Sequence, residues 1–311
     1  ALLFSVNDSP IVSAFGHFVV QGNYIGTDIT GTLDLGNRIG VGVQVQGGST
    51  GNLIGGEAVG AGNVIAFNAG DGVEVVNGTD NAIVRNSIFA NTGLAIDLGP
   101  DGVTANDSGD GDTGANSLQN FPVLSSAVTT GTQITITGTL NSTASTSYRI
   151  EFYANTTGDG AGYGEGQTLI GIADVTTDAF GNASYSPTFT VAVAPGSAIS
   201  ATVSRLDAGD MEVETSEFAL NVIATAGNAA PTITNLGGDS LAYSEGDGAV
   251  VIEQGANASV ADVDSTDFNS GTLTVSFTAG SDSAEDVLSI RNQGTGAGQI
   301  GVSGSNVTYG G

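Results

Sequence analysis

The sequence predicts an all-β protein, in which a short parallel β-helix is followed by two β-sandwich domains and the second sandwich looks unfinished. Three observations support this fold class. A pattern that recurs after 23 residues lies near the N-terminus, separate alternating apolar runs follow it, and no segment has the periodicity of an amphipathic helix.

The clearest repeat joins segments 63–75 and 86–98. Its six matched pairs are Asn63 with Asn86, Ile65 with Ile88, Asn68 with Asn91, Gly70 with Gly93, Val73 with Ile96 and Val75 with Leu98. Apolar residues two apart face the same side of a strand, so these can stack into a core along a solenoid axis. The asparagines would then form ladders between coils. An asparagine-rich loop without a ladder is the alternative.

Weaker copies of the coil precede this repeat. Segments 23–26 and 52–55 resemble the start of the coil. Val41, Val43 and Val45 repeat the alternating strand. We assign residues 18–115 to the β-helix. Residues 1–17 have no coil to join, so we expect them to cap the open solenoid end or to pair as a donated strand with another chain. They lack the basic start of a signal peptide, which indicates a start inside a longer precursor.

Composition limits the partners. The chain has 32 acidic residues, five arginines, no lysine and no cysteine, and its net charge is -27. This charge argues against nucleic acid and anionic membrane surfaces as partners. No apolar run is long enough for a membrane-spanning helix, so no membrane insertion is expected. The charge must be tolerated by dilution, by salt or by bound cations.

Five aspartates crowd one glycine-rich stretch after the repeat: Asp97, Asp101, Asp107, Asp110 and Asp112. Flexible oxygen ligands spaced by small residues suit Ca²⁺, which takes about six to eight oxygens. The spacing is not that of an EF-hand loop. We therefore predict a calcium-binding loop over 97–112. A solvated acidic loop without an ion is the alternative.

Residues 116–226 are predicted to form an antiparallel β-sandwich. Alternating runs are separated by turns rich in glycine, aspartate and asparagine, at the spacing of such a fold. The expected strands are 134–138, 148–153, 169–175, 183–193, 199–203 and 218–223. We expect the scattered acids of this domain to lie on its surface, namely Glu165, Asp207, Asp210, Glu212 and Glu214.

A third domain is assigned to residues 227–311. It has acids in two turns, Glu245 and Asp247 in one and Asp262, Asp264 and Asp267 in the other. Carboxylates gathered in turns at the end of a sandwich resemble the calcium arrangement of cadherin-like domains, although plain polar turns are the alternative. The domain ends on an alternating strand at 300–309 and lacks the closing strands of a complete sandwich.

Several passages resemble very large secreted bacterial surface proteins of the adhesin type: GNYIGTD at 22–28, NLIGG at 52–56, NSLQNFPVL at 116–124, YGEGQT at 163–168 and 290–311. The resemblance covers nearly the whole chain and is weakest over 1–17. It implies a right-handed parallel β-helix, then immunoglobulin-like and cadherin-like sandwiches. It also implies a secreted structural or adhesive role at the cell surface, with calcium making the modules rigid.

An enzyme acting on polysaccharides is the rival class, because parallel β-helices commonly have that activity. A polysaccharide-active enzyme of that architecture would be expected to use lysine, arginine, histidine or paired aspartates for catalysis. This chain has no lysine and a single histidine, His17, before the first recognisable coil. Arg38 and Arg85 are poor bases, because a guanidinium rarely deprotonates. We expect no enzyme; glycan binding without chemistry stays open.

The two unpaired ends suggest a mode of assembly. If the apolar segment 2–6 paired with the third domain of the next molecule, contacts would be heterologous and would build a filament. The expected partners are therefore copies of the same chain or neighbouring modules of the same protein. The alternative is that 1–15 simply covers the solenoid end.

Overall fold

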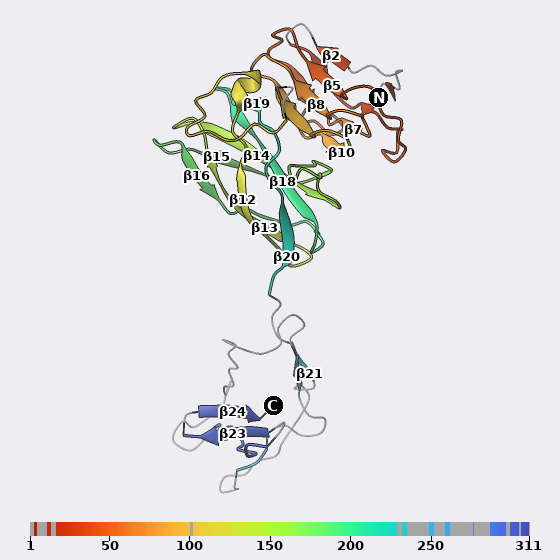
Figure 1. Ribbon diagram of the computed structural model, residues 1–311. Helices are drawn as coiled ribbons and strands as arrows, with labels where there is room; N and C mark the ends of the chain where they lie inside the picture. Colours follow the sequence, from red (N-terminus) through yellow and green to blue (C-terminus); the bar gives the residue numbers. More distant parts are fainter. Residues whose placement is uncertain are drawn as a thin grey trace. The chain divides into compact units, whose positions relative to one another are not determined.

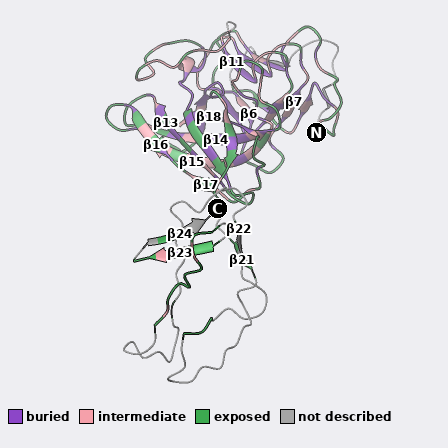
Figure 2. Cartoon of the chain, turned by 60° about the horizontal axis from the view of Figure 1, so that its bottom comes forward, coloured by how far each residue is buried: buried purple, intermediate pink, exposed green. Residues whose placement is uncertain are grey.

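The computed structural model describes residues 3–4, 11–13, 17–99, 102–228, 232–234, 249–251, 259–261, 276, 287–296, 299–304 and 306–310 (Figure 1). The chain divides into two compact units, Ala1–Gly227 and Asn228–Gly311. The described residues are all-β, with no α-helix and one 3-10 helix, η1 (Ala115–Leu118). The predicted all-β class is confirmed. In Figure 2 the buried residues concentrate in the first unit.

Three parallel sheets form the N-terminal part of the first unit. Consecutive strands go to the three sheets in turn, so the chain winds through the same three positions repeatedly; we call this part, Leu3 to Leu98, the coil region. The first sheet holds β1 (Leu3–Phe4), β4 (Tyr24–Ile25), β7 (Val64–Ala66) and β10 (Ser87–Phe89). The second holds β2 (Ile11–Ser13), β5 (Val43–Val45), β8 (Val73–Val75) and β11 (Ile96–Leu98). The third holds β3 (Val19–Val20), β6 (Leu53–Gly55) and β9 (Ala82–Val84).

The N-terminal segment joins these sheets. Strand β1 pairs in parallel with β4, and β2 pairs in parallel with β5. The expectation that this segment has no coil to join was therefore wrong for the strands described. The strands are only two and three residues long, too short for the alternating pattern that marks the later coils.

The predicted stacking of apolar residues is confirmed. Val43, Val73 and Ile96 share one register position on three strands of the second sheet. Val45, Val75 and Leu98 share another, and all six side chains are buried. Burying one such aliphatic side chain contributes about 1.5–3 kcal/mol, so the stack stabilises the coil region.

Asparagine ladders join the coils, as predicted. Asn63 Nδ2 donates to Asn86 Oδ1 at 2.9 Å, and Asn68 Nδ2 donates to Asn91 Oδ1 at 2.8 Å. The first ladder extends back to Asn23, whose Nδ2 donates to Asn63 Oδ1 at 3.0 Å. These asparagines are buried, and an unpaired amide in such a position would cost about 1–3 kcal/mol.

A third ladder was not predicted, because the sequence pattern grouped 52–55 with 23–26 as equivalent coil starts. That grouping was wrong: β6 lies in the third sheet and β4 in the first. Asn52 Nδ2 donates to Asn81 Oδ1 at 2.6 Å. Asn116 ends this ladder, because its Oδ1 accepts from the Asn81 amide nitrogen at 3.0 Å and its Nδ2 donates to the Asn81 carbonyl at 2.7 Å. Asn116 lies beyond the last repeat of the sequence, in η1, so no periodic signal marks it.

A nine-stranded sheet forms the rest of the first unit. Its order is β15-β14-β18-β20-β12-β13-β16, with β17 on β13 and β19 on β18. The end strands β15 and β16 also contact each other, so the sheet nearly closes around its core. The strands are β12 (Val123–Thr129), β13 (Ile134–Asn141), β14 (Ser147–Asn155), β15 (Thr168–Thr176), β16 (Asn182–Tyr185), β17 (Thr188–Phe189), β18 (Ala198–Leu206), β19 (Glu212–Thr215) and β20 (Val222–Ala226).

The predicted strands of this region agree with the structure in part. The single run expected over 183–193 is two short strands, β16 and β17, with Pro187 between them; proline has no amide hydrogen to continue a ladder. The strand expected over 218–223 lies instead at β20, because Phe218 and Ala219 turn into the core before it. Strands β12 and β19 were not predicted.

The nine-stranded sheet covers the last coil. Ile88 and Gly166 exchange both backbone hydrogen bonds, at 2.9 and 2.8 Å. Thr215 donates its amide hydrogen to the Asn81 carbonyl and accepts from the Ile83 amide through its hydroxyl. Tyr153 and Phe218 of this sheet region belong to the same buried apolar cluster as the coil core. The end of the coil region is thus capped by the following part of the same chain.

The second unit contains two antiparallel strand pairs among its described residues. They are β21 (Thr232–Thr234) with β22 (Ser259–Ala261), and β23 (Gln299–Ser303) with β24 (Asn306–Gly310). The single strand expected over 300–309 is therefore a hairpin, which turns at Gly304 with a φ of 61°. The predicted ligands Glu245, Asp247, Asp262, Asp264 and Asp267 lie outside the described residues.

Candidate metal centre

The acidic loop connects the coil region to the nine-stranded sheet, and asparagine side chains fix it in place. Asn120 accepts from the Asp107 amide at 3.0 Å through Oδ1 and donates to the Asp107 carbonyl at 2.8 Å through Nδ2. Asn106 forms the same reciprocal pair with the backbone of Phe121. Asn141 of β13 accepts from the Gly109 amide at 2.8 Å. The loop is therefore held against the sheet, and the Gly111 amide within it donates to the carboxylate of Asp107.

Three of the predicted aspartates meet at one point. Carboxylate oxygens of Asp107, Asp110 and Asp112 lie within 4.8 Å of one another. Asp110 Oδ1 accepts from the Asn120 amide at 2.9 Å, and its Oδ2 accepts from the Ser142 hydroxyl at 2.5 Å. Asp112 Oδ1 is buried and has no hydrogen-bond partner among the described residues. The arrangement presents several negative oxygens toward a common position.

The electrostatics of this triad favour a cation. Burial is the main cause that raises the pKa of Asp110, against the hydrogen bonds from Ser142 and Asn120, and the charges of Asp112 and Asp107 raise it further. Burial also raises the pKa of Asp112, with Asp107 as the second cause. The ion pairs found among the described residues involve other acids. A bound cation would remove the mutual repulsion.

The donor set fits Ca²⁺ among the common metals. All three side chains offer hard oxygen ligands, and Ca²⁺ accepts six to eight oxygens at about 2.3–2.6 Å in a flexible geometry. Carboxylates that bind through one or two oxygens, backbone carbonyls and water can complete such a shell. Zinc would instead favour histidine or cysteine, and this chain has no cysteine and one histidine.

The other predicted ligands of this loop do not join the triad. Asp97 lies in the middle of β11, opposite Glu74 of β8, and belongs to a different acidic group. Asp101 lies outside the described residues. The spacing in sequence suggested one group of five because it could not reveal that Asp97 sits in a strand, where the pairing register fixes its direction.

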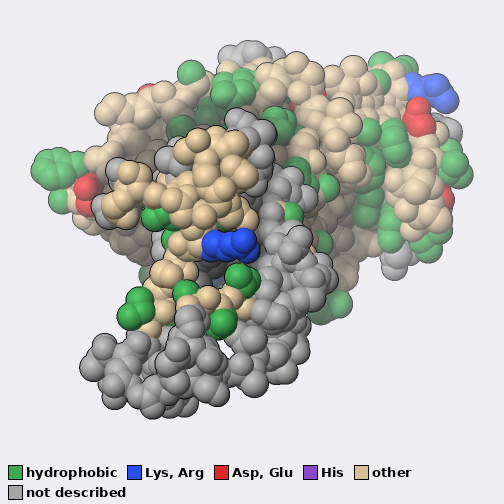
Figure 3. Space-filling model, turned by 90° about the horizontal axis from the view of Figure 1, so that it is seen from below, with side chains coloured by type: hydrophobic (Ala, Val, Ile, Leu, Met, Phe, Trp, Pro, Cys, Tyr) green, Lys and Arg blue, Asp and Glu red, His purple; other side chains and the backbone are tan. Residues whose placement is uncertain are grey.

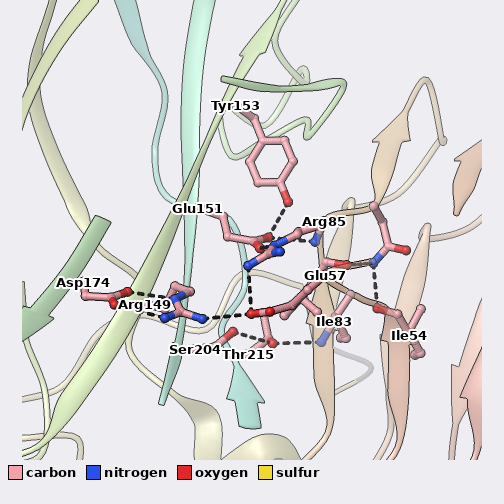
Figure 4. A network of polar contacts seen from close by, with 12 residues as sticks. Ile54, Glu57, Ile83, Arg85, Arg149, Glu151, Tyr153, Asp174, Ser204 and Thr215 are labelled. Atoms are coloured by element: carbon pink, nitrogen blue, oxygen red, sulfur yellow. Dashed lines mark hydrogen bonds and ion pairs between the residues drawn. The ribbon is translucent and has the colours of Figure 1, made fainter. Parts of the chain in front are cut away.

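A network of ion pairs crosses the junction between the coil region and the nine-stranded sheet (Figure 4). Glu57 Oε1 lies 3.0 Å from both Arg85 and Arg149. Arg149 also pairs with Asp174 at 2.8 Å. Glu151 is buried, accepts from the Arg85 amide at 2.9 Å and from the Tyr153 hydroxyl at 2.6 Å, and lies 3.4 Å from Arg85 Nε. These contacts hold the two regions in register.

The expectation that the scattered acids lie on the surface was wrong for three of the five. Glu165, Glu212 and Glu214 are buried, whereas Asp207 and Asp210 are exposed. Burial raises the pKa of Glu165 to about 7, and burial together with the charge of Glu151 raises the pKa of Glu212 to about 7. The sequence around these acids gave no sign of their burial, because the burial arises where this region docks on the coil region.

A surface hollow of about 560 Å³ lies on the coil region. Its lining residues include Tyr24, Val59, Val64 and Gln21. Gln21 Nε2 is already bonded to the Gly55 carbonyl at 2.8 Å, which fixes the amide in position. A ring beside fixed polar groups is an arrangement that can hold a sugar.

Comparison of the chain with protein-family models and with curated proteins gives no match. No helix among the described residues is long and apolar enough to cross a membrane. On the face drawn in Figure 3, the described surface is mostly uncharged, with scattered apolar side chains and few charged ones. Function is therefore inferred from the geometry of the sites themselves.

Proposed function

We propose that this chain is a segment of a secreted structural or adhesive protein of the cell surface, made rigid by calcium and without enzymatic activity. In this proposal the coil region is a right-handed parallel β-helix, the nine-stranded sheet is an immunoglobulin-like sandwich, and the second unit is a cadherin-like module. Copies of the same protein or neighbouring modules would be its partners. The parallel sheets visited in turn and the nearly closed sheet support this architecture.

The observation that carries the proposal is the triad Asp107, Asp110 and Asp112 in the connecting loop. Its backbone is bonded to Asn120 and Asn141, so an ion there would be attached to the sheet through the loop. Nearer the start of the loop, the Thr104 amide donates to Glu217 at 2.9 Å, and Glu217 also accepts from the Leu98 amide of β11. Calcium would thus stiffen the one covalent connection between the two regions of the first unit.

The proposal keeps head-to-tail assembly of copies into a fibre, with the N-terminal segment remaining on its own chain. Strands β1 and β2 pair with β4 and β5 of their own chain, which leaves them no free edge on that side. Because β1 and β2 are the end strands of their sheets, end-to-end association in this proposal would use their other edges.

Thermal unfolding with and without calcium tests the proposal. A ligand that binds only the folded state stabilises it by about 2.7 kcal/mol at a concentration 100 times its dissociation constant. We expect the unfolding midpoint of the wild-type chain to rise in millimolar calcium relative to excess chelator. Asp110→Asn should lose most of that rise.

Asp210→Asn is the matched control. Asp110 and Asp210 both have a left-handed backbone, with φ of 58° and 59°, and asparagine tolerates that conformation. Asp210 is exposed and lies outside the triad. A calcium response that is unchanged in Asp110→Asn, or lost equally in Asp210→Asn, would overturn the proposal.

Glycan binding is the second candidate, and the hollow beside Tyr24 is what favours it. The phenol ring could stack on a sugar face while backbone groups of the lining bond its hydroxyls. Titration of the chain with neutral oligosaccharides, compared between wild type and Tyr24→Ala, tests it. Binding that survives the substitution would exclude this site.

A further inference from the structure

The turn after β8 contains the one asparagine of the sequence that a glycine follows, Asn77 with Gly78. Asn77 is exposed, and its side-chain oxygen Oδ1 accepts from the Gly48 amide at 2.6 Å. Gly78 has a φ of 95°, a conformation that a residue with a side chain rarely adopts. A β-carbon at this position would also clash with the Ser49 carbonyl oxygen. The fold therefore requires a glycine directly after this asparagine.

An asparagine followed by glycine carries a nucleophile and an electrophile in one short segment. Attack of the Gly78 backbone nitrogen on the Asn77 Cγ closes a five-membered ring, and the missing side chain of glycine leaves room for the approach. In the part of the chain that the structure describes, nothing accepts a hydrogen bond from the Gly78 amide. No such bond has to break before the nitrogen attacks.

The Gly48 amide is placed to promote this attack. It donates to Asn77 Oδ1, which is the atom on which negative charge develops when a nucleophile adds to Cγ. A fixed N–H donor at such an oxygen stabilises the developing charge, as the donors of an oxyanion hole do. The turn thus combines an accessible side chain, an unbonded nucleophile and a donor on the oxygen of the electrophile.

We propose that Asn77 is a site of spontaneous covalent modification, at which the side-chain amide is lost through a cyclic imide. The Gly78 nitrogen bonds to Asn77 Cγ, and the bond from Cγ to the side-chain nitrogen breaks. That nitrogen leaves as ammonia, taking the proton of the Gly78 amide. Water then opens the ring at either of its two carbonyl groups. One opening gives aspartate, and the other gives isoaspartate, in which the main chain runs through the side-chain carbon atoms.

The two products differ in their effect on the third ladder. The Gly78 carbonyl accepts from the Asn116 amide at 2.7 Å, and Asn116 ends that ladder where the coil region meets the nine-stranded sheet. Aspartate keeps the course of the main chain and an oxygen for the Gly48 amide. Isoaspartate adds a methylene to the main chain just before Gly78, so it displaces the carbonyl from Asn116. The modification therefore weakens one end of the ladder without any role for calcium.

Incubation of the full chain in chelator at pH 8 and 37 °C, followed by peptide mapping with mass spectrometry, tests the proposal. Asn182 is the internal reference, because it is also exposed but precedes an alanine. We expect Asn77 to lose its amide at least about tenfold faster than Asn182, and to give both aspartate and isoaspartate. The urea midpoint of the incubated chain should lie below that of fresh protein.

Asn77→Gln is the matched control, since it keeps the amide group but would have to close a larger ring. This variant should keep its amide and its urea midpoint over the same incubation. Equal rates of conversion at Asn77 and Asn182 would overturn the proposal. An Asn77 that persists in the folded chain but converts in the chain unfolded by urea would overturn it as well, because the fold would then protect the side chain.

Discussion

Ile88 and Gly166 exchange both of their backbone hydrogen bonds, at 2.9 and 2.8 Å, although Ile88 belongs to the last turn of the coil region and Gly166 to the segment just before β15 of the nine-stranded sheet. This bridge satisfies a strand edge that the coil region would otherwise expose. An open parallel edge invites pairing with other chains, so its cover has to be stable.

Truncation at the junction core should destabilise the first unit strongly. Phe218 is 3% exposed and packs edge-to-face on Tyr153, with ring centroids 5.4 Å apart. We expect Phe218→Ala to lower the free energy of unfolding by about 3–5 kcal/mol, measured by urea denaturation followed by circular dichroism. Phe180→Ala, at an exposed turn, is the control and should change it by less than about 0.5 kcal/mol. Equal effects of the two substitutions would show that the junction core is not formed as described.

Removal of one ladder asparagine should lower the free energy of unfolding by more than the loss of its own hydrogen bonds alone. Asn63 Oδ1 accepts from the backbone and side chain of Asn23, and its Nδ2 donates to Asn86 and to the Val20 carbonyl. Asn63→Ala leaves several buried groups unpaired, at about 1–3 kcal/mol each. We expect a loss of at least about 2 kcal/mol in the same urea assay. Asn77→Ala, at an exposed position, should lose about 1 kcal/mol or less, and the account of the ladder fails if it loses as much.

The acids of the junction network should differ sharply in how much they contribute to the free energy of unfolding. The Glu57 side chain is 56% exposed, so Glu57→Gln should change stability by less than about 1 kcal/mol despite its two arginine partners. Glu151 is buried, and Glu151→Leu would leave the Arg85 amide and the Tyr153 hydroxyl without their acceptor. We expect a loss of about 3–5 kcal/mol for that variant. The reverse order of the two effects in urea denaturation would contradict the described network.

Stability in chelator should fall as pH rises toward neutrality. Burial raises the pKa of Glu165 to about 7 from an ordinary value of 4.5, so the folded chain keeps a proton that the unfolded chain has already released. The resulting stability is complete below pH 4.5, declines as pH rises to about 7, and does not decline further above that. We expect a lower urea midpoint at pH 8 than at pH 5, and a smaller difference in Glu165→Gln. A midpoint difference as large in Glu165→Gln as in the wild type would show that this carboxyl is not the cause.

A structural feature could be predicted from the sequence where its residue pattern repeats along the chain. The stacks of Val73 with Ile96 and of Asn63 with Asn86 follow from a period that the sequence shows twice in one register. The ladder partner Asn116 and the capping residue Phe218 occur once each, far from the coils that they contact. Long-range docking of that kind leaves no local pattern, because any polar or apolar residue at those positions reads as an ordinary loop or strand residue.

The acidic loop likewise has a part that the sequence predicts and a part that it does not. Its composition indicated an oxygen-rich site, and Asp107, Asp110 and Asp112 do converge. Composition could not separate Asp97 from them, since strand register rather than spacing sends that side chain to Glu74. Nor could it reveal that Glu212 is buried, because its burial depends on how the nine-stranded sheet meets the coil region.

The central claim is that calcium bound by the loop triad stiffens the connection between the two regions. Hydrogen–deuterium exchange of residues 102–122, followed by mass spectrometry in millimolar calcium and in chelator, measures this most directly. The account predicts that calcium slows exchange in this segment of the wild type, does so equally in Asp210→Asn, and has little effect there in Asp110→Asn. Exchange in this segment that is the same with and without calcium in the wild type would contradict it.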